Sequence, residues 1–467
     1  MKAIKLSCVA LAISITTGCS SMLQKNDFKS INEPINKGDI ATAAMNAEKM
    51  AGEIDPESGE SEDLIWALHA GTLNYATGND KRSVMYFDSA EKHFRDENSE
   101  GVVETAGETT GAVLVNDTVL DYEPSQYDMV YANHYKAMSL WKMNDESAAR
   151  VEFNRSAERQ RRAANHFEKI IIEKKELEES EDSKQVDYSK AMSDIDLKVA
   201  ETVDMTGSKW LPYDGYVNPA VTYANALFFM LEGKSKGDYN KAVDGFKRVY
   251  GMSKNAAVKT DLQMARGLAS GKSKDSYKPT IWVIHEDGLA PKKTELRFDL
   301  PIFLLTGEPQ MASYAIPKMD EGTQAFGSVS IDHFTTQEVA DVSKIIKSEF
   351  KEELPVIKAR AAASTISKVV MQAAAAQVAK EDDTGVGAVF QVATMLYSLG
   401  STSADIRTNV ALPNSVGVTR LPKRERLAIK AGPFEIPVQT DPNSKYSIIY
   451  VRTMNAVAQP TVSVINI

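Results

Sequence analysis

The residues of this chain best suited to ligating a metal or transferring protons are six histidines: His69, His93, His134, His166, His285 and His333. No two of them fall at metal-ligand spacing, and none belongs to an HExxH pattern. The run from His285 to Gly288, HEDG, could place three ligands or an acid–base group in one turn. A strand that ends in an ordinary Asp-Gly turn is the favoured interpretation. The sequence also lacks a GxSxG elbow. We therefore predict no catalytic residues, no metal and no cofactor.

The two cysteines, Cys8 and Cys19, draw attention to the start of the chain. Two lysines precede a brief apolar run, Leu6 to Ile15, which is too short to span a membrane as a permanent helix. The run ends in TTGC, which resembles the lipobox of bacterial lipoproteins, although leucine is usual where Thr16 stands. The resemblance implies that residues 1–18 are a signal peptide and that Cys19 is acylated. An ordinary cleaved signal with a chance cysteine is the alternative.

The residue after Cys19 bears on the destination of such a lipoprotein. It is Ser20 rather than Asp, which in Gram-negative lipoproteins implies sorting to the outer membrane. We therefore expect a protein anchored in the outer membrane by its N-terminal lipid and facing the periplasm. Loss of Cys8 and acylation of Cys19 would leave no disulfide and no thiol chemistry, which suits an oxidising compartment. The formal net charge of −10 argues against nucleic acid as a partner, because phosphate repels an acidic surface.

Residues 19–276 are predicted to form a helical domain in which helices pack in pairs. A small, small, aromatic, small pattern typical of a tetratricopeptide (TPR) pair occurs twice, at Gly71, Ser83, Phe87 and Ala90 and at Ala137, Ala149, Phe153 and Ser156. A third pair is expected over residues 219–252, with Ala242 and Phe246 in its second helix. Small residues let two helices touch, and the aromatic fills the gap to the next pair. Because the repeats are irregularly spaced, we predict a TPR-like solenoid rather than a strict repeat.

A long helix is predicted at about residues 150–182. It carries a cationic stripe at spacing i, i+4, i+7, formed by Arg155, Arg159 and Arg162. One interpretation is a contact with a partner, an anion or phospholipid. The other, which we favour, is a face whose charges are solvated or paired internally with Glu152 and Glu158.

A second candidate for partner binding is the loop WLPYDGYVNP, residues 210–219. Its aromatic residues include Trp210, Tyr213 and Tyr216. Exposed Trp and Tyr side chains can anchor a protein or a sugar. Aromatic residues in a loop rich in Pro and Gly more often hold the loop against the body of the protein, and we favour that interpretation.

The chain changes character at Tyr277, and residues 277–467 are predicted to form a β-rich, sandwich-like domain. Residues 280–285 are β-branched and aromatic, and residues 295–300 alternate with period two. A helical insertion is expected at about residues 335–404. A capping box at Thr335 and Glu338 would open it, and Pro355 would break or kink it. The predicted fold class is therefore α+β, with a solenoid followed by a β domain that a helical hairpin interrupts.

The hairpin at residues 356–404 has two possible environments. Its second limb, Thr384 to Ala404, holds no charged residue, so it could enter a bilayer and serve a transport or pore complex. The first limb, however, carries Arg360 and Lys368, and each central charge costs about 2.5–3.5 kcal/mol on insertion scales. Packing against protein is therefore favoured, either within this chain or in a homo-oligomer.

Four stretches of the sequence together suggest a family. They begin with LVNDTVLDYEPSQYDMVYANHYKAMSLW and ARVEFNR, and continue with YVNPAVTYANALFFMLEGK, EDGLAPKKTELRFDLPIFL and SADIRTNVALPNSVGVTRLP. Over roughly residues 60–430 the chain resembles a family of Gram-negative outer-membrane lipoproteins with a TPR-like N-terminal half and no established biochemical activity. The family usually has a Trp shortly after the residue that corresponds to Arg407, whereas Thr408-Asn409-Val410 follows here. Relatives often look like neighbours of lipoproteins that activate penicillin-binding proteins.

We expect a non-enzymatic, lipid-anchored scaffold that binds a protein partner during assembly or maintenance of the cell envelope. In this reading the solenoid presents its concave face to the partner. Two alternatives stay open: a component of a transport or pore complex that uses residues 356–404, and an unrecognised hydrolase acting on the cell wall.

Overall fold

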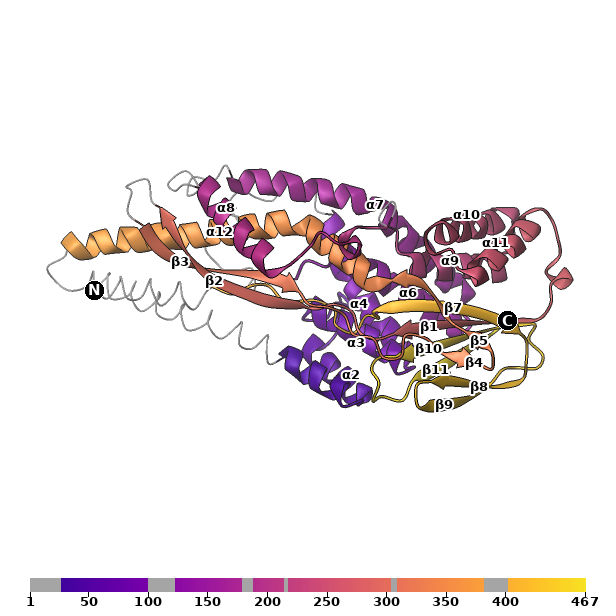
Figure 1. Cartoon of the computed structure of the whole chain (residues 1–467). Coiled ribbons are helices and arrows are strands. Elements are labelled where there is room, and N and C mark those ends of the chain that lie inside the picture. Colours follow the sequence, from indigo (N-terminus) through magenta and orange to yellow (C-terminus); the bar gives the residue numbers. More distant parts are fainter. Residues whose placement is uncertain (1–26, 100–121, 179–187, 214–216, 304–308, 382–401) are drawn as a thin grey trace.

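Helices dominate the first part of the chain, and β-strands form much of the rest (Figure 1). The computed structural model describes residues 27–99, 122–178, 188–213, 217–303, 309–381 and 402–467. The last short helical turn of the first part, η5, ends at Ser276, and the first strand begins at Thr280. The fold class is α+β, as predicted. The signal peptide, Cys19, Tyr216 and most of the second hairpin limb lie outside the described residues.

The helical part is built from antiparallel pairs of neighbouring helices. They are α3 (Leu64–Ala76) with α4 (Asp80–Ser99), α6 (Gln126–Lys142) with α7 (Glu146–Glu178), and α9 (Pro219–Leu231) with α10 (Lys236–Ser253). In the first pair, a Cβ atom added at Gly71 would lie 2.7 Å from the Phe87 ring, so only glycine fits there. Phe87, Phe153 and Phe246 are all buried, which confirms the predicted packing role of these aromatics.

Aromatic contacts join one pair to the next. The ring of Phe228 in α9 lies 4.8 Å from Phe153 and 5.1 Å from Trp141, between centroids. The remaining helices flank the pairs: residues 27–36 and α2 (Ile40–Ala51) precede them, α8 (Tyr188–Thr202) and the turn η3 (Ser208–Trp210) lie between α7 and α9, and α11 (Ala256–Ala269) follows. The predicted long helix is α7, which begins four residues earlier than residue 150.

A five-stranded sheet forms the centre of the C-terminal part. Its order is β11-β10-β1-β7-β6, with bounds Thr461–Asn466, Tyr446–Thr453, Thr280–Asp287, Ser415–Pro422 and Gln337–Asp341. Strands β1 and β10 are parallel, whereas the other neighbours are antiparallel. Every residue of β1 and of β10 is buried, so both faces of the central strands are covered.

A second sheet covers one face of the first. It has the order β5-β4-β8-β9, with bounds Phe334–Thr335, Ser330–Ile331, Arg426–Ala431 and Phe434–Gln439. The small core between the two sheets contains Ile281, Val283 and Ile449 from the first and Ile429 and Val438 from the second. This sheet-on-sheet arrangement is the predicted sandwich-like domain.

The other face of the five-stranded sheet packs on the first helices of the pairs. All 13 residues of α3 are buried, and one hydrophobic core includes both Leu68 and Ile448. Hydrogen bonds cross the contact, such as Trp282 Nε1 to Asp261 of α11 (2.9 Å) and the amide of Asn409 to Thr72 (3.0 Å). The row formed by α3, α6 and α9 is therefore occupied by the chain's own C-terminal part, and this face is not open to a partner.

A long arm extends from the body, to the left in Figure 1. It contains the hairpin of β2 (Lys293–Phe303) and β3 (Pro309–Met319), α8, the C-terminal part of α7 and much of α12 (Val342–Glu381). The prediction that a helix begins near residue 335 is wrong. Residues Gln337–Asp341 form β6 because their backbone bonds to β7, a pairing that overrides the local capping pattern.

Of the two effects predicted for Pro355, a break or a kink, the break into two helices is wrong. Helix α12 runs through it for 40 residues. A proline inside a helix costs about 3 kcal/mol. Burial of Leu354 and Val356 on either side, and of the alanines further along, offsets that cost. Of the hairpin, the structure describes only the first limb and residues 402–404.

The first limb packs on protein. Ala359, Ala362, Ile366 and Val369 are buried, and Lys368 is only 4 % exposed. Within the described residues, no helix has both the length and the apolar character that crossing a bilayer demands.

Candidate functional site

The predicted arginine stripe on α7 is paired internally. Arg155 Nη1 lies 2.7 Å from a carboxylate oxygen of Glu152, and Arg162 Nε lies 3.0 Å from Glu158. These two glutamates are the partners that the sequence suggested. Arg155 and Arg162 are the more exposed members of the stripe, at 37 % and 68 % of their side chains. The favoured interpretation, a paired face, is confirmed.

Arg159, the middle residue of the stripe, belongs to a polar network between α4, α6 and α7. Its guanidinium donates to Glu91 (3.1 Å) and to the side chain of Asn133, and it lies 4.8 Å from the Phe94 ring centroid. Asn133 also donates to Glu152 (2.7 Å). Each of these three helices thus contributes a charged or amide group. Arg159 holds the α6–α7 helix pair against α4 of the first helix pair.

The aromatic loop packs against α12. Trp210 is 7 % exposed, and the ammonium of Lys347 lies 5.4 Å from its ring centroid. The Tyr213 hydroxyl accepts a hydrogen bond from the backbone N–H of Asp341 (3.0 Å), and Lys344 lies 4.5 Å above its ring. Burial raises the pKa of Tyr213 to about 12. These two aromatics therefore hold the loop on the body, as we favoured.

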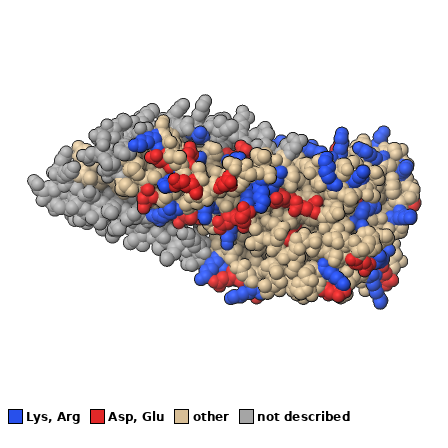
Figure 2. All heavy atoms as spheres, viewed as in Figure 1, with Lys and Arg blue, Asp and Glu red and all other residues tan. Residues whose placement is uncertain are grey.

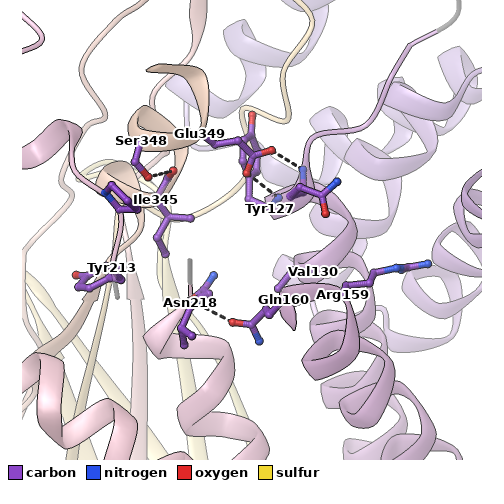
Figure 3. Close-up of a pocket in the computed structure, with 12 residues that line it drawn as sticks. Tyr127, Val130, Arg159, Gln160, Tyr213, Asn218, Ile345, Ser348 and Glu349 are labelled. Carbon is purple, nitrogen blue, oxygen red and sulfur yellow. Dashed lines mark hydrogen bonds between the residues drawn. The ribbon is translucent and has the colours of Figure 1, made fainter. Parts of the chain in front are cut away.

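Arg159 and Tyr213 nevertheless line the same cleft (Figure 3). Helices α6 and α7 form one wall, and the loop before α9 and the start of α12 form the other. No pattern in the sequence predicts that these two candidates lie together. The enclosed volume is about 30 Å³, which suits one or two water molecules and is far below the several hundred Å³ of a typical ligand pocket.

Glu349 of α12 is the most unusual group in this cleft. Its carboxylate accepts hydrogen bonds from the backbone N–H groups of Gln126 (2.5 Å) and Tyr127 (3.3 Å), at the first turn of α6. Ser125, at the N-cap position of α6, makes no side-chain capping bond. Glu349 thus takes the place of a local cap and ties α12 to α6. Burial, and then the neighbouring Glu353, raises the pKa of Glu349 well above its ordinary value.

A second buried carboxyl, Asp128, lies in the same turn of α6. It accepts a hydrogen bond from the Tyr122 hydroxyl (2.6 Å). Burial raises the pKa of Asp128 to about 7. Perturbed carboxyl groups often mark catalytic acids and bases. Here both carboxyls are buried: Glu349 ties α12 to α6, whereas Asp128 bonds to Tyr122, just before α6, so their geometry suits packing rather than meeting a substrate.

The HEDG run is the buried end of a strand, the interpretation that we favoured over a ligand or acid–base site. Adjacent side chains of a strand point to opposite faces of a sheet, so the three possible ligands cannot converge. Glu286 points to the helices, where Tyr135 donates to it (3.2 Å). Asp287 accepts from the backbone N–H groups of residues 325–327 (2.9–3.1 Å), and Gly288 follows with φ +72°. His285 bonds to Thr453 (2.7 Å), and burial lowers its pKa to about 4.

Two further histidines are buried in the solenoid. Burial lowers the pKa of His69 to about 4 and that of His134 to about 3, so both are neutral at physiological pH. His69 accepts from the backbone N–H of Val410 (3.2 Å), a contact between α3 and the C-terminal part. Across the described part of the chain, no group of three His, Cys, Asp or Glu side chains is arranged to hold a metal ion.

Sequence reasoning missed Glu349 and Asp128. A signal for Glu349 was present: it follows Ile345 by four residues and precedes Val356 by seven, which places a charge on the apolar stripe of its helix. Asp128 had no comparable signal, because an acidic residue in the first turn of a helix is common.

Comparisons with known proteins add no relative. No family model matches the chain, and neither curated proteins nor solved structures give a match.

Proposed function

We propose that this protein is a non-enzymatic scaffold, anchored by a lipid on Cys19 in the outer membrane and facing the periplasm, that binds a protein partner in the cell envelope. The anchor rests on the lipobox-like end of the leader. The envelope role rests on the resemblance described above.

The observation that carries the scaffold role is the filled face of the solenoid. TPR-like arrays bind partners on the concave surface that their stacked helices create. Here the first helices of the pairs pack on the chain's own C-terminal part, as the bonds from Tyr135 of α6 to Glu286 and from Asn409 to Thr72 of α3 illustrate. Partner binding therefore falls to surfaces outside that row, and the arm is one such surface.

The arm has exposed apolar side chains suited to this task. Leu197 of α8 is 60 % exposed and Met311 of β3 is 67 % exposed, although both elements also contribute buried residues to the arm. Aromatic and thioether side chains that face solvent are common anchors at protein interfaces. The hydrolase alternative has less support, because the cleft that collects the candidate residues has room only for water.

Photo-crosslinking in intact cells tests the partner surface. A photoreactive amino acid placed at Leu197 or Met311 should give adducts with an envelope protein. The matched control is Val457, which is 66 % exposed on the body, in the loop after β10. Adducts from Val457 alone, or from none of the three sites, would rule the arm out as the binding surface.

The anchor is tested separately. Cys19→Ser should release the protein from membranes or leave the leader uncleaved. Unchanged processing and unchanged fractionation with the outer membrane would show that Cys19 carries no lipid.

A further inference from the structure

Strand β11 forms one edge of the five-stranded sheet, and its hydrogen bonds reveal which backbone groups face outward. Tyr446 and Ile467 exchange both backbone hydrogen bonds (2.9 Å each). In an antiparallel pair such bonded positions recur at every second residue, so Thr461, Ser463 and Ile465 also bond to β10. The N–H and C=O groups of Val462, Val464 and Asn466 therefore point away from the sheet. Within the described residues, nothing bonds to them.

The opposite edge of the same sheet, β6, is protected. The side chain of Asn255 donates to the carbonyl of Gln337 (3.0 Å), and the Tyr213 hydroxyl accepts from the N–H of Asp341. The register of β6 also shifts between Glu338 and Ala340, which marks a bulge. Bulges, charges and covering groups are the means by which proteins keep strand edges from pairing with other chains.

The outer strands of the other sheets are protected as well. Strand β9 contains Glu435 and Pro437, and β5 is only two residues long. Strand β2 has charged residues at alternate positions, and β3 contains Pro309 and Pro317. Each of these features discourages strand addition.

Strand β11 has none of these protections. Its sequence TVSVIN carries no charge and no proline, and its register with β10 is continuous. Only Ile465 of its residues is buried, whereas all eight residues of β10 are. Figure 2 shows a broad area free of Lys, Arg, Asp and Glu on this face, where Figure 1 labels β10 and β11. An exposed, uncharged edge of this kind is a template for another strand.

We propose that β11 pairs with β11 of a second copy of this chain, antiparallel and centred on Val464. In this register Val464 lies opposite the same residue of the copy, and Val462 lies opposite Asn466. All six outward-facing residues then exchange hydrogen bonds, and two five-stranded sheets become one continuous sheet. A twofold axis between identical strands satisfies both copies with the same contacts.

Charge does not oppose the pairing of two copies at β11. The chain as a whole has a net charge of −10, which opposes self-association over most of its surface. The pairing strand is neutral, so no like charges face each other across the new contact. In the proposed register Ile467 lies opposite Thr461 of the copy, and the Ile467 residues of the two copies stand about 20 Å apart along the strands.

Cysteine cross-linking tests this register. In the full-length chain with Cys8 and Cys19 replaced by serine, Val464→Cys provides the sole thiol. Two such residues directly opposite each other have Cα atoms about 5.5 Å apart, within the range of a disulfide. Mild oxidation of the purified protein in detergent should convert most of the chain to a covalent dimer. Val457→Cys, an exposed thiol away from β11, is the control and should form no covalent dimer.

A proline variant tests the hydrogen bonds themselves. The wild-type chain should sediment at twice the mass of one chain, and Val464→Pro should sediment at the single-chain mass. The N–H lost at Val464 points outward, so the ladder to β10 remains, and the melting temperature should fall only by the packing that the Val464 side chain makes with the core between the two sheets. Val464→Lys, which places two charges face to face, should also give monomers if the proline variant proves unstable. A monomeric wild type, a dimeric Val464→Lys, or cross-linking of Val464→Cys to a different protein only, would overturn the proposal.

Discussion

The first and second helices of the solenoid pairs have different surroundings. All 13 residues of α3 are buried, whereas α10 buries only Ala242, Phe246 and Val249. The first helices pack on their pair partners on one side and on the sheet on the other. The second helices, α4, α7 and α10, pack on their pair partners through one apolar stripe and expose more of their side chains, although α7 also contacts α12 and α10 also contacts α11.

This difference shows how the chain uses a repeat architecture. A solenoid leaves one surface of stacked helices free for a ligand. In this protein the C-terminal part supplies what a ligand would: the side chains of Trp282 and Arg420 bond to Asp261, and the backbone N–H of Val410 bonds to His69. The solenoid therefore supports the sheet and the arm, and the partner surface that we propose lies outside the row of first helices.

The largest effect should come from the aromatic packing within the pairs. Phe153→Ala removes a fully buried ring that contacts Phe228 and Trp141, and should lower the free energy of unfolding by about 3–5 kcal/mol. Val151→Ala, at an exposed position of the same helix, should change it by less than about 0.5 kcal/mol. Urea denaturation measures both. Equal effects would mean that α7 has no distinct inner face.

A smaller loss should follow from weakening the contact between solenoid and sheet. Asp261→Asn keeps the side-chain shape but removes the charge that Arg420 Nη1 meets at 2.7 Å, and should cost about 2–3 kcal/mol. The same change at the exposed Asp244 of α10 is the control. Because Trp282 also bonds to Asp261, its fluorescence should change in the first variant only. If Asp261→Asn left the free energy of unfolding unaltered, the sheet would not be packed tightly on the solenoid face.

Asp128 of α6 should make the free energy of unfolding depend on pH. Its pKa is raised to about 7 in the folded state, so the folded protein keeps a proton that the unfolded chain has already lost. This contribution to stability is complete below pH 4 and is lost as the pH rises through about 7. Asp128→Asn mimics the protonated group, and at pH 8 it should be more stable than the wild type by about 1–2 kcal/mol. Urea denaturation at several pH values measures the free energy of unfolding of both proteins. If Asp128 were exposed instead, this free energy would depend on pH in the same way in the wild type and in Asp128→Asn.

The smallest effects should come from the arginine stripe, and they should differ within it. Arg159→Ala leaves Glu91 and Asn133 without their shared donor and should cost about 1 kcal/mol, because the arginine is partly exposed. Arg162→Ala removes a pair that is 68 % exposed at the arginine, so the loss should stay below about 0.5 kcal/mol. Thermal melts at low and high salt distinguish them, since salt screens only the exposed pair. Similar salt dependence would place both arginines on the outer surface.

The sequence by itself determined the local pieces of this fold. Spacing of small and aromatic residues located the helix pairs around Phe87 and Phe153, and alternation located strands such as β2. The internal pairing of Arg155 and Arg162 was also readable, because their partners, Glu152 and Glu158, lie three or four residues away on the same helix. Each of these features depends on residues close together in the chain.

Tertiary structure decided the features that depend on distant residues. Thr335 and Glu338 satisfy a helix-capping pattern, but the backbone of Glu338 finds its partner at Gly417 in β7. Glu349 caps a helix more than two hundred residues earlier in the chain, a contact that no local pattern encodes. The filling of the solenoid face and the unprotected edge of β11 are likewise set by which surfaces meet. A linear pattern specifies which face of an element is apolar, whereas the choice of the surface that covers it belongs to packing of the whole chain.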